Sequence, residues 1–318
     1  MSRLWAHMRR LWPRWTLLPP APFVLYGMVM LVCGELRWEH VGMILLVTGL
    51  AYTNETSKKL CKISYGMGLI GLFYDAMRYV RNVGVSPERV HLCDLRALEI
   101  KLFGITMGGE RVTVHDWFLT HHWDALDLWC AVPYGTFIFA SLGCAVVLYL
   151  RDARAVQRFS WAFCLMNVIG FATYHIYPAA PPWYYHAHQC VVDMTANPQA
   201  GPRLEHVDAL LGFDYFRGMY TRSSDIYGAV PSLHVAYPGM ILLNGFRLFK
   251  LPGKIFSIVF FVSMCFAAVY LDHHWIIDIV VGLVYCVACW ALVGFILARL
   301  QKPASASAQT PLLPEPGA

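Results

Sequence analysis

The sequence predicts an all-α, polytopic membrane protein, and three observations carry this prediction. Of the 318 residues, 58% are hydrophobic and only 14% are charged, whereas a soluble domain has roughly 25% charged residues. The mean hydropathy is +0.48, and aromatic residues, which are enriched at membrane interfaces, make up 14% of the chain. The net charge of +5 is too small to indicate a nucleic-acid partner. The composition therefore excludes an ordinary soluble enzyme.

Apolar segments long enough to cross a bilayer, at roughly 20 residues per crossing, occur about eight times along the chain. They cover residues 22–38, 40–57, 62–81, 127–149, 157–177, 230–248, 255–271 and 275–299. Charged residues at Glu35, Arg37 and Glu39 leave room for only a tight turn between the first two segments. No small-residue cleavage site follows the first segment, so we expect it to be retained as an anchor.

Positive charges mark every second connection between these segments. They are Arg9 and Arg10 before the first, Lys58 and Lys59 after the second, Arg151 and Arg154 after the fourth, Arg247 and Lys250 after the sixth, and Arg299 after the eighth. The positive-inside rule then puts both termini in the cytoplasm and the long segments 82–126 and 178–229 outside. We expect four parts, listed in chain order. They are N-terminal membrane helices (1–81), an outer interfacial segment (82–126), a transmembrane core (127–300) with outer loop 178–229, and a disordered tail (301–318).

Histidines open two of the predicted spans from the outward side. His234 ends the segment Gly-Ala-Val-Pro-Ser-Leu-His, and His274 belongs to the segment Asp-His-His-Trp-Ile-Ile-Asp that ends at Asp278. Because His274 and Asp278 are four residues apart, a helix would bring their side chains together, and we expect a hydrogen bond of ~3 Å. The carboxylate would hold one imidazole nitrogen protonated and leave the other as a nucleophile. His234, His274 and Asp278 are therefore the candidate catalytic residues.

These motifs resemble the second and third motifs of the type 2 phosphatidic acid phosphatase superfamily. The further resemblance is to its inositol phosphorylceramide synthase branch. It rests on Tyr177–Tyr184, Gly228–His234 and Tyr270–Asp278, with weaker echoes at Tyr74–Arg78 and within 99–127. The resemblance implies a six-helix catalytic core and transfer of phosphoinositol from phosphatidylinositol to a ceramide-like hydroxyl, with release of diacylglycerol. His274 would form a phosphohistidine, His234 would be the general acid and base, and no cofactor or metal is expected.

Two departures from the superfamily bear on the type of reaction. Its phosphatases carry an arginine six residues before the third-motif histidine, where this chain has Ala268, and basic residues in the first motif, where Tyr177–Tyr184 has none. A phosphomonoester presents up to two charges to such a clamp and a diester only one, so the loss favours a diester-cleaving transferase. The alternative is a lipid phosphate phosphatase in which Arg217 or Arg222 replaces the clamp.

Substrate-binding candidates flank the catalytic motifs. They are Tyr177, Pro181, Trp183, Arg222, Ser232, His273, Asp75 and Arg78. The proline-rich rim after the fifth span is either an interfacial anchor or the wall of a lipid-access cleft. Asp75 and Arg78, three residues apart, form either a structural ion pair or a headgroup-binding pair. The resemblance implies a bacterial inner membrane, or a Golgi membrane in a eukaryote, with the site on the periplasmic or lumenal face.

Several histidines and cysteines remain outside these motifs. His115, Asp116, His121 and His122 have loose metal-ligand spacing, but nothing completes a site, so we interpret them as a surface or interfacial segment. Cys286 and Cys289 lie within a predicted span and are interpreted as packing residues. Cys93 and Cys190 fall in the outward segments and could form a disulfide, but their spacing in the sequence does not decide this.

Overall fold

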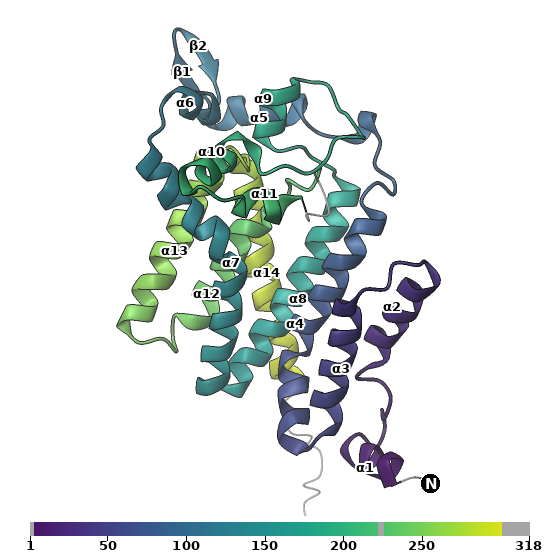
Figure 1. The fold of residues 1–318 in the computed structure, drawn as a ribbon. Helices are drawn as coiled ribbons and strands as arrows, with labels where there is room; N and C mark the ends of the chain where they lie inside the picture. Colours follow the sequence, from purple (N-terminus) through teal and green to yellow (C-terminus); the bar gives the residue numbers. More distant parts are fainter. Residues whose placement is uncertain (1–2, 222–225, 301–318) are drawn as a thin grey trace, which may run out of the picture.

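The computed structural model describes residues 3–221 and 226–300, and these are mostly helical (Figure 1). The predicted tail at 301–318 and the candidate Arg222 lie outside the described residues. The helices are α1 Arg3–Leu11, α2 Ala21–Val32, α3 Trp38–Tyr52, α4 Glu55–Val80, η1 Pro87–Arg89, α5 Cys93–Phe103, α6 Val114–Thr120, α7 Asp124–Arg151, α8 Ala153–Ile176, α9 Pro182–His188, α10 Gly201–Leu211, α11 Tyr215–Tyr220, α12 Leu233–Gly245, α13 Leu251–Tyr270 and α14 Ile276–Leu300. A short antiparallel hairpin joins β1 Ile105–Met107 to β2 Glu110–Val112.

Each of the eight predicted spans has a helical counterpart: α2, α3, α4, α7, α8, α12, α13 and α14. Four of them, α7, α8, α13 and α14, are long and apolar enough to cross a membrane. Helices α2 and α12 have 12 and 13 residues and are shorter than predicted, about 18–20 Å against about 30 Å of hydrocarbon. Helix α12 begins late because the Ser232 hydroxyl caps it by accepting from the Val235 N–H (3.4 Å), after Pro231.

Long helices pack into a bundle that holds the start of α12 against α14. Helix α8 packs against both α4 and α14, and α12 packs against α7, α13 and α14. Gly282 of α14 lies directly against the backbone of Ser232, where an added Cβ would clash with the Ser232 carbonyl. This close approach fixes the second turn of α14 beside the start of α12. The two predicted histidine motifs therefore meet at one end of the bundle.

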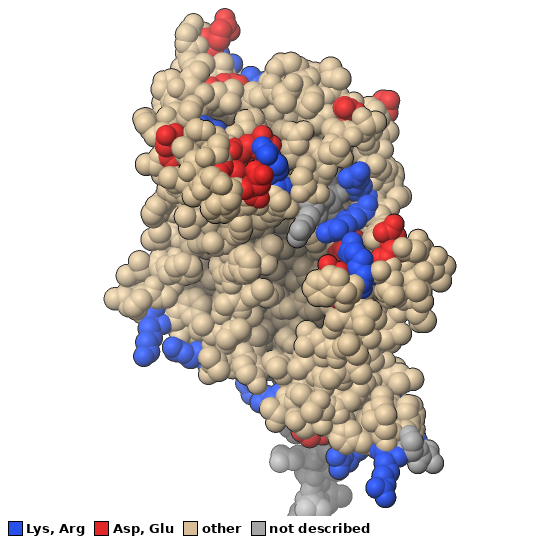
Figure 2. All heavy atoms as spheres, viewed as in Figure 1, with Lys and Arg blue, Asp and Glu red and all other residues tan. Residues whose placement is uncertain are grey.

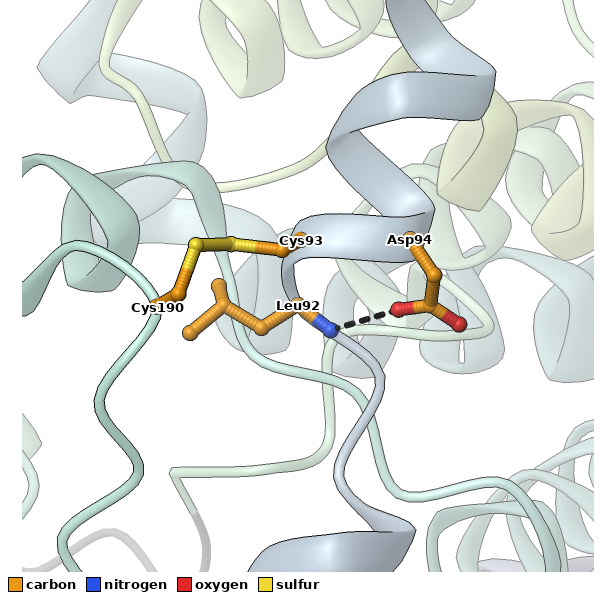
Figure 3. Close-up of a disulfide and its surroundings, with 4 residues drawn as sticks. All are labelled: Leu92, Cys93, Asp94 and Cys190. Atoms are coloured by element: carbon orange, nitrogen blue, oxygen red, sulfur yellow. Dashed lines mark hydrogen bonds between the residues drawn. A yellow bond between two sulfur atoms is a disulfide. The ribbon is translucent and has the colours of Figure 1, made fainter.

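The two predicted outer segments lie together at that same end, above the long helices (Figure 1). Short bridges pair Ala179 with both His91 and Gly228, so the two segments are joined through their backbones. A disulfide between Cys93 at the start of α5 and Cys190 after α9 joins them covalently (Figure 3). Figure 2 shows mostly basic side chains along the opposite, lower edge, whereas both signs of charge occur at the upper end. Side chains of Cys286 and Cys289 are buried in the core, as predicted.

Candidate active site

The three candidate catalytic residues converge where α12 and α14 begin. His234 is the second residue of α12, His274 immediately precedes the turn into α14, and Asp278 lies in its first turn. His234 Nδ1 lies 3.0 Å from His274 Nε2. His274 Nδ1 lies 3.4 Å from Asp278 Oδ2 but is hydrogen-bonded to the Ala229 carbonyl at 3.1 Å. The direct bond of ~3 Å that the sequence predicts is therefore replaced by a longer contact of 3.4 Å between the ring nitrogen and the carboxylate.

The different geometry has a simple cause. Asp278 Oδ2 accepts a hydrogen bond from the Trp275 N–H at 2.9 Å, so this carboxylate also caps the first turn of α14. This hydrogen bond keeps the carboxylate close to its own helix, so that Oδ2 lies 3.4 Å from His274 Nδ1. The Ala229 carbonyl, which precedes α12, takes the shorter bond. Both oxygens face the same ring nitrogen and orient the imidazole together.

These contacts define the tautomer of His274. A carbonyl oxygen only accepts, so the bond to Ala229 requires a hydrogen on Nδ1. Burial lowers the pKa of His274 to about 4, so the ring is neutral at pH 7 and Nε2 carries a free lone pair. His234 Nδ1 then donates to that lone pair. A neutral, oriented imidazole nitrogen is the form that attacks phosphorus.

A cavity of about 390 Å³ opens from these histidines into the bundle. Its walls include Gly71 and Tyr74 of α4, Phe137 and Ser141 of α7, and Phe163 and Phe171 of α8. Among the described residues that line it there is no Lys, Arg, Asp or Glu. An apolar cavity of this kind, between membrane helices and with polar groups at one end, suits a lipid with its headgroup at the histidines.

Predicted substrate-binding residues near the motifs have different environments. Pro181 and Trp183 line the cavity. His273 also lines it, but its Nε2 donates to the Ala200 carbonyl at 2.7 Å and so holds the start of α10. The Ser232 hydroxyl is occupied as the cap of α12. Tyr177 does not line the cavity, because its ring stacks on His91 with 3.8 Å between centroids.

Asp75 joins three N-terminal helices. It accepts from the Tyr26 hydroxyl at 2.7 Å and contacts His40 Nε2 at 2.9 Å, and it forms an ion pair with Arg37. Arg78 Nε is farther away, at 3.7 Å. The sequence spacing missed Arg37 and His40 because their contacts depend on how α2, α3 and α4 pack. These contacts favour the structural alternative for Asp75, and neither Asp75 nor Arg78 lines the cavity.

The superfamily's arginine position is part of the packed core here. Ala268 is fully buried, and its carbonyl accepts from the backbone N–H groups of His273 (3.1 Å) and His274 (2.9 Å). Arg217 pairs with Asp214 at 3.1 Å on the surface and does not line the cavity. Within residues 3–221 and 226–300, no arginine therefore replaces the missing clamp.

The interpretation as a surface or interfacial segment is wrong for His115, which is buried, whereas Asp116 is partly buried and His121 and His122 are exposed. His115 is 1% exposed, and its Nδ1 lies 3.2 Å from Oδ1 of Asp272, which is two residues before His274. Asp116 contacts His186 Nε2 at 3.1 Å and accepts a fork of two bonds from Arg96. Sequence spacing missed these contacts because each joins segments that are far apart in the chain. The outer segment therefore packs against the loop that carries His274.

A second polar cluster lies at the outer end of α7. Ligand atoms of Asp124, Asp127 and His206 fall within 4.8 Å of one another, a spacing that could hold a metal ion. Asp127 is fully buried, and Arg203 Nη1 lies 3.4 Å from its Oδ1. Because this guanidinium already offsets the buried carboxylate, we interpret the cluster as an ion-pair group that fastens α10 to α7.

Two adjoining histidines, a nearby carboxylate and an apolar cavity between long apolar helices define an integral membrane protein with the features of an enzyme active site. The chain belongs to the PAP2 superfamily, which it matches over residues 104–292. That range contains His234, His274 and Asp278, and it confirms the family that the motifs predicted.

Relatives within this family are similar over different shares of the chain. The phosphoinositol dihydroceramide synthase of Bacteroides thetaiotaomicron is 30% identical over 287 residues, 87% of this chain and 90% of the relative. The inositol phosphorylceramide synthase of Candida albicans is 30% identical over 191 residues, 59% of this chain and 39% of the relative. The inositol phosphorylceramide synthase catalytic subunit of Saccharomyces cerevisiae is 30% identical over 193 residues, 59% of this chain and 45% of the relative. The match thus spans less than half of each fungal relative, and no solved structure matches significantly.

Proposed function

We propose that this chain transfers a phosphoinositol group from phosphatidylinositol to the hydroxyl of a ceramide-like lipid and releases diacylglycerol. The observation that carries the proposal is the cavity, which has two histidines at one end and no cationic side chain among its described residues. A phosphodiester needs less counter-charge than a monoester, and its lipid chains need an apolar space. The relatives, all named as phosphoinositol ceramide or dihydroceramide synthases, support a phosphoinositol transferase over a phosphatase.

In the first step, His274 Nε2 attacks the phosphorus of phosphatidylinositol, and a P–N bond replaces the bond from phosphorus to the diacylglycerol oxygen. The donor phosphate enters between His274 Nε2 and His234 Nδ1, which are 3.0 Å apart before it binds. His234, in its protonated form, gives its proton to the leaving oxygen, and neutral diacylglycerol departs. Asp278 and the Ala229 carbonyl stabilise the positive charge that develops on the His274 ring.

The second step reverses the first with a different alcohol. The ceramide hydroxyl gives its proton to His234 while its oxygen attacks phosphorus, and the P–N bond breaks to release neutral His274. Apolar walls formed by residues such as Phe137 and Phe163 favour a lipid alcohol over water at the phosphohistidine. Both lipids remain in the bilayer, which raises the concentration of the acceptor next to the site.

The first expected result concerns the donor and the acceptor. Purified protein given phosphatidylinositol and ceramide should form inositol phosphorylceramide about 100-fold faster than it releases phosphate from phosphatidic acid, because the cavity lacks the cations that a dianion needs. Mass spectrometry of the lipids and a phosphate assay measure the two rates side by side. The matched control is the same pair of assays on the Asp214→Ala variant, which frees Arg217 at the surface and should leave the ratio unchanged. Rapid phosphate release without transfer to any lipid alcohol would establish the phosphatase instead.

We also propose that the site faces the periplasm or a lumen. The cystine between Cys93 and Cys190 supports this side, because disulfides persist in oxidising compartments. The basic lower edge of the molecule supports a cytoplasmic position for the opposite end, by the positive-inside rule. The catalytic histidines lie beneath the outer segments that this cystine joins, so they would share its side.

Sidedness has its own expected result. In sealed vesicles with the outer face exposed, a membrane-impermeant maleimide should label the protein only after the cystine is reduced, and at both Cys93 and Cys190. A Cys33→Ser background removes the exposed free thiol that would otherwise add to the signal. The control is the same variant with both cystine residues changed to Ser, which should stay unlabelled. Labelling of the cystine pair only in inverted vesicles would reverse the proposed orientation.

A further inference from the structure

Buried and partly buried acidic and imidazole side chains alternate beside the catalytic loop, residues 271–275. His115 lies between Glu99 and Asp272, with Nε2 4.0 Å from Glu99 Oε1 and Nδ1 3.2 Å from Asp272 Oδ1. His186 lies between Asp272 and Asp116, with Nδ1 2.6 Å from Asp272 Oδ2 and Nε2 3.1 Å from Asp116 Oδ1. We call these five residues the outer chain. They come from α5, α6, α9 and the loop itself, and none of them lines the cavity.

One end of the outer chain holds the helix that carries Asp278. Glu99 is 1% exposed, and its two oxygens accept from the first two backbone N–H groups of α14, Ile276 at 2.9 Å and Ile277 at 3.3 Å. These amides have no partner within their own helix, and a carboxylate at a helix N-terminus is favoured by the helix dipole. A residue 177 positions away in the sequence therefore caps the helix whose first turn orients His274.

Asp272, at the middle of the outer chain, restrains the backbone of the loop that carries His274. Asp272 adopts a φ of +66°, a left-handed backbone conformation that is uncommon for residues other than glycine. Its carboxylate contacts both His115 and His186, and its backbone carbonyl accepts a hydrogen bond from the Trp183 N–H at 2.9 Å. Strained residues of this kind persist where the surroundings over-determine them. His274 follows Asp272 by two residues, so the contacts of Asp272 also restrain the backbone at His274.

We propose that the outer chain is the positioning device of the active site: Glu99 and Asp272 set the place of α14 and of the catalytic loop, so that His274 Nε2 points into the cavity. These residues act through His274 and Asp278 and do not touch the substrate. The inference deepens the proposed function and rests on it for its kinetic readout. It also gives the outer segment, residues 82–126, an indirect part in the chemistry of the transmembrane core, through the position of His274.

The charges of the outer chain give this device a pH dependence. The pKa of His186 is raised to about 9, because its hydrogen bonds and attraction to Asp116 and Asp272 outweigh its burial. In spite of burial, the pKa of Asp116 is lowered by its bonds to His186 and Arg96, and the pKa of Asp272 is lowered by His115 and His186. His186 is also flanked by Tyr185, and Arg96 and Thr113 bond to Asp116. Because the folded pKa of His186 exceeds its ordinary value of 6.5, its stabilisation is complete below pH 6.5 and is lost as the pH rises through about 9.

The test compares Asp272→Asn, Glu99→Gln and His186→Gln in full-length protein, with Glu110→Gln, an exposed carboxylate of the β1–β2 hairpin, as the control. With phosphatidylinositol and ceramide, the first two variants should lower kcat about 10- to 100-fold and leave KM within about twofold. His186→Gln should lower kcat below pH 9 and abolish the fall in kcat that the unchanged protein shows near that pH. The control should match the unchanged protein throughout.

Hydrogen exchange of the backbone amides gives a readout that needs no substrate. In Asp272→Asn and Glu99→Gln, peptides that cover 271–279 should exchange faster, while peptides from α8 should be unchanged. Unchanged exchange and kcat in both variants, or an unaltered alkaline limb in His186→Gln, would overturn the positioning role. If the unchanged protein transfers no phosphoinositol, the proposed function fails, but faster exchange at 271–279 would still support the outer chain as the device that holds the loop.

Discussion

Replacing His274 with Ala should abolish transfer, with kcat at least about 10⁴-fold lower, because the variant lacks the nitrogen that forms the phosphoryl–nitrogen bond. His274 is the ring with an unprotonated nitrogen facing the cavity, and both the Ala229 carbonyl and Asp278 fix that tautomer. The covalent intermediate should disappear together with turnover. The measurement is trapping of radiolabelled phosphoinositol on the protein, followed by a test for the acid-labile, alkali-stable bond of a phosphohistidine.

A matched control for this experiment is His121→Ala. His121 is an exposed histidine of the outer segment whose ring stacks on Trp117, outside the cavity. This variant should keep both its turnover and its labelled intermediate. Near-normal activity in the His274→Ala protein, or label that maps to a different residue, would refute the assignment of the nucleophile.

The sequence predicts the helical fold well because hydropathy is a local property. Apolar runs and the alternation of basic loops locate the eight helices and group the two outer segments at one end. Helix lengths are less well predicted, because caps decide them: Ser232 starts α12 later than its apolar run begins. Among the described residues, four helices are both long and apolar enough to cross a membrane.

Site residues carried by local motifs could be predicted, whereas those defined by long-range contacts could not. His234, His274 and Asp278 could be found because two short motifs carry them and the positive-inside rule puts those motifs at one depth. The roles of Glu99 and His115 could not be found in this way. Their contacts to Ile276 and Asp272 join segments more than 150 residues apart, and no local pattern encodes such a contact. Buried polar groups of this kind are recognisable only when the partner that satisfies them is known.

Replacing His234 with Ala should slow the reaction by roughly 10²–10⁴-fold without removing the nucleophile, because general acid catalysis is worth about that much. The His234 ring stacks against Tyr134 with 4.8 Å between centroids, which holds Nδ1 toward His274 and the phosphate that enters between them. Without His234, diacylglycerol must leave as an unprotonated alkoxide. The first step should therefore limit the rate, and the phosphohistidine should not accumulate.

A donor with a better leaving group distinguishes general acid catalysis by His234 from an effect of this residue on the shape of the site. Inositol 4-nitrophenyl phosphate releases a phenolate that needs no proton, so the His234→Ala protein should form the phosphohistidine from it at nearly the rate of the unchanged protein. The same donor should not rescue His274→Ala, which has no nitrogen to receive the phosphoryl group. The release of nitrophenolate in a rapid-mixing experiment measures the first step alone. If His234→Ala were equally slow with both donors, its defect would lie in the shape of the site, and the general acid would have to be sought elsewhere in the cavity.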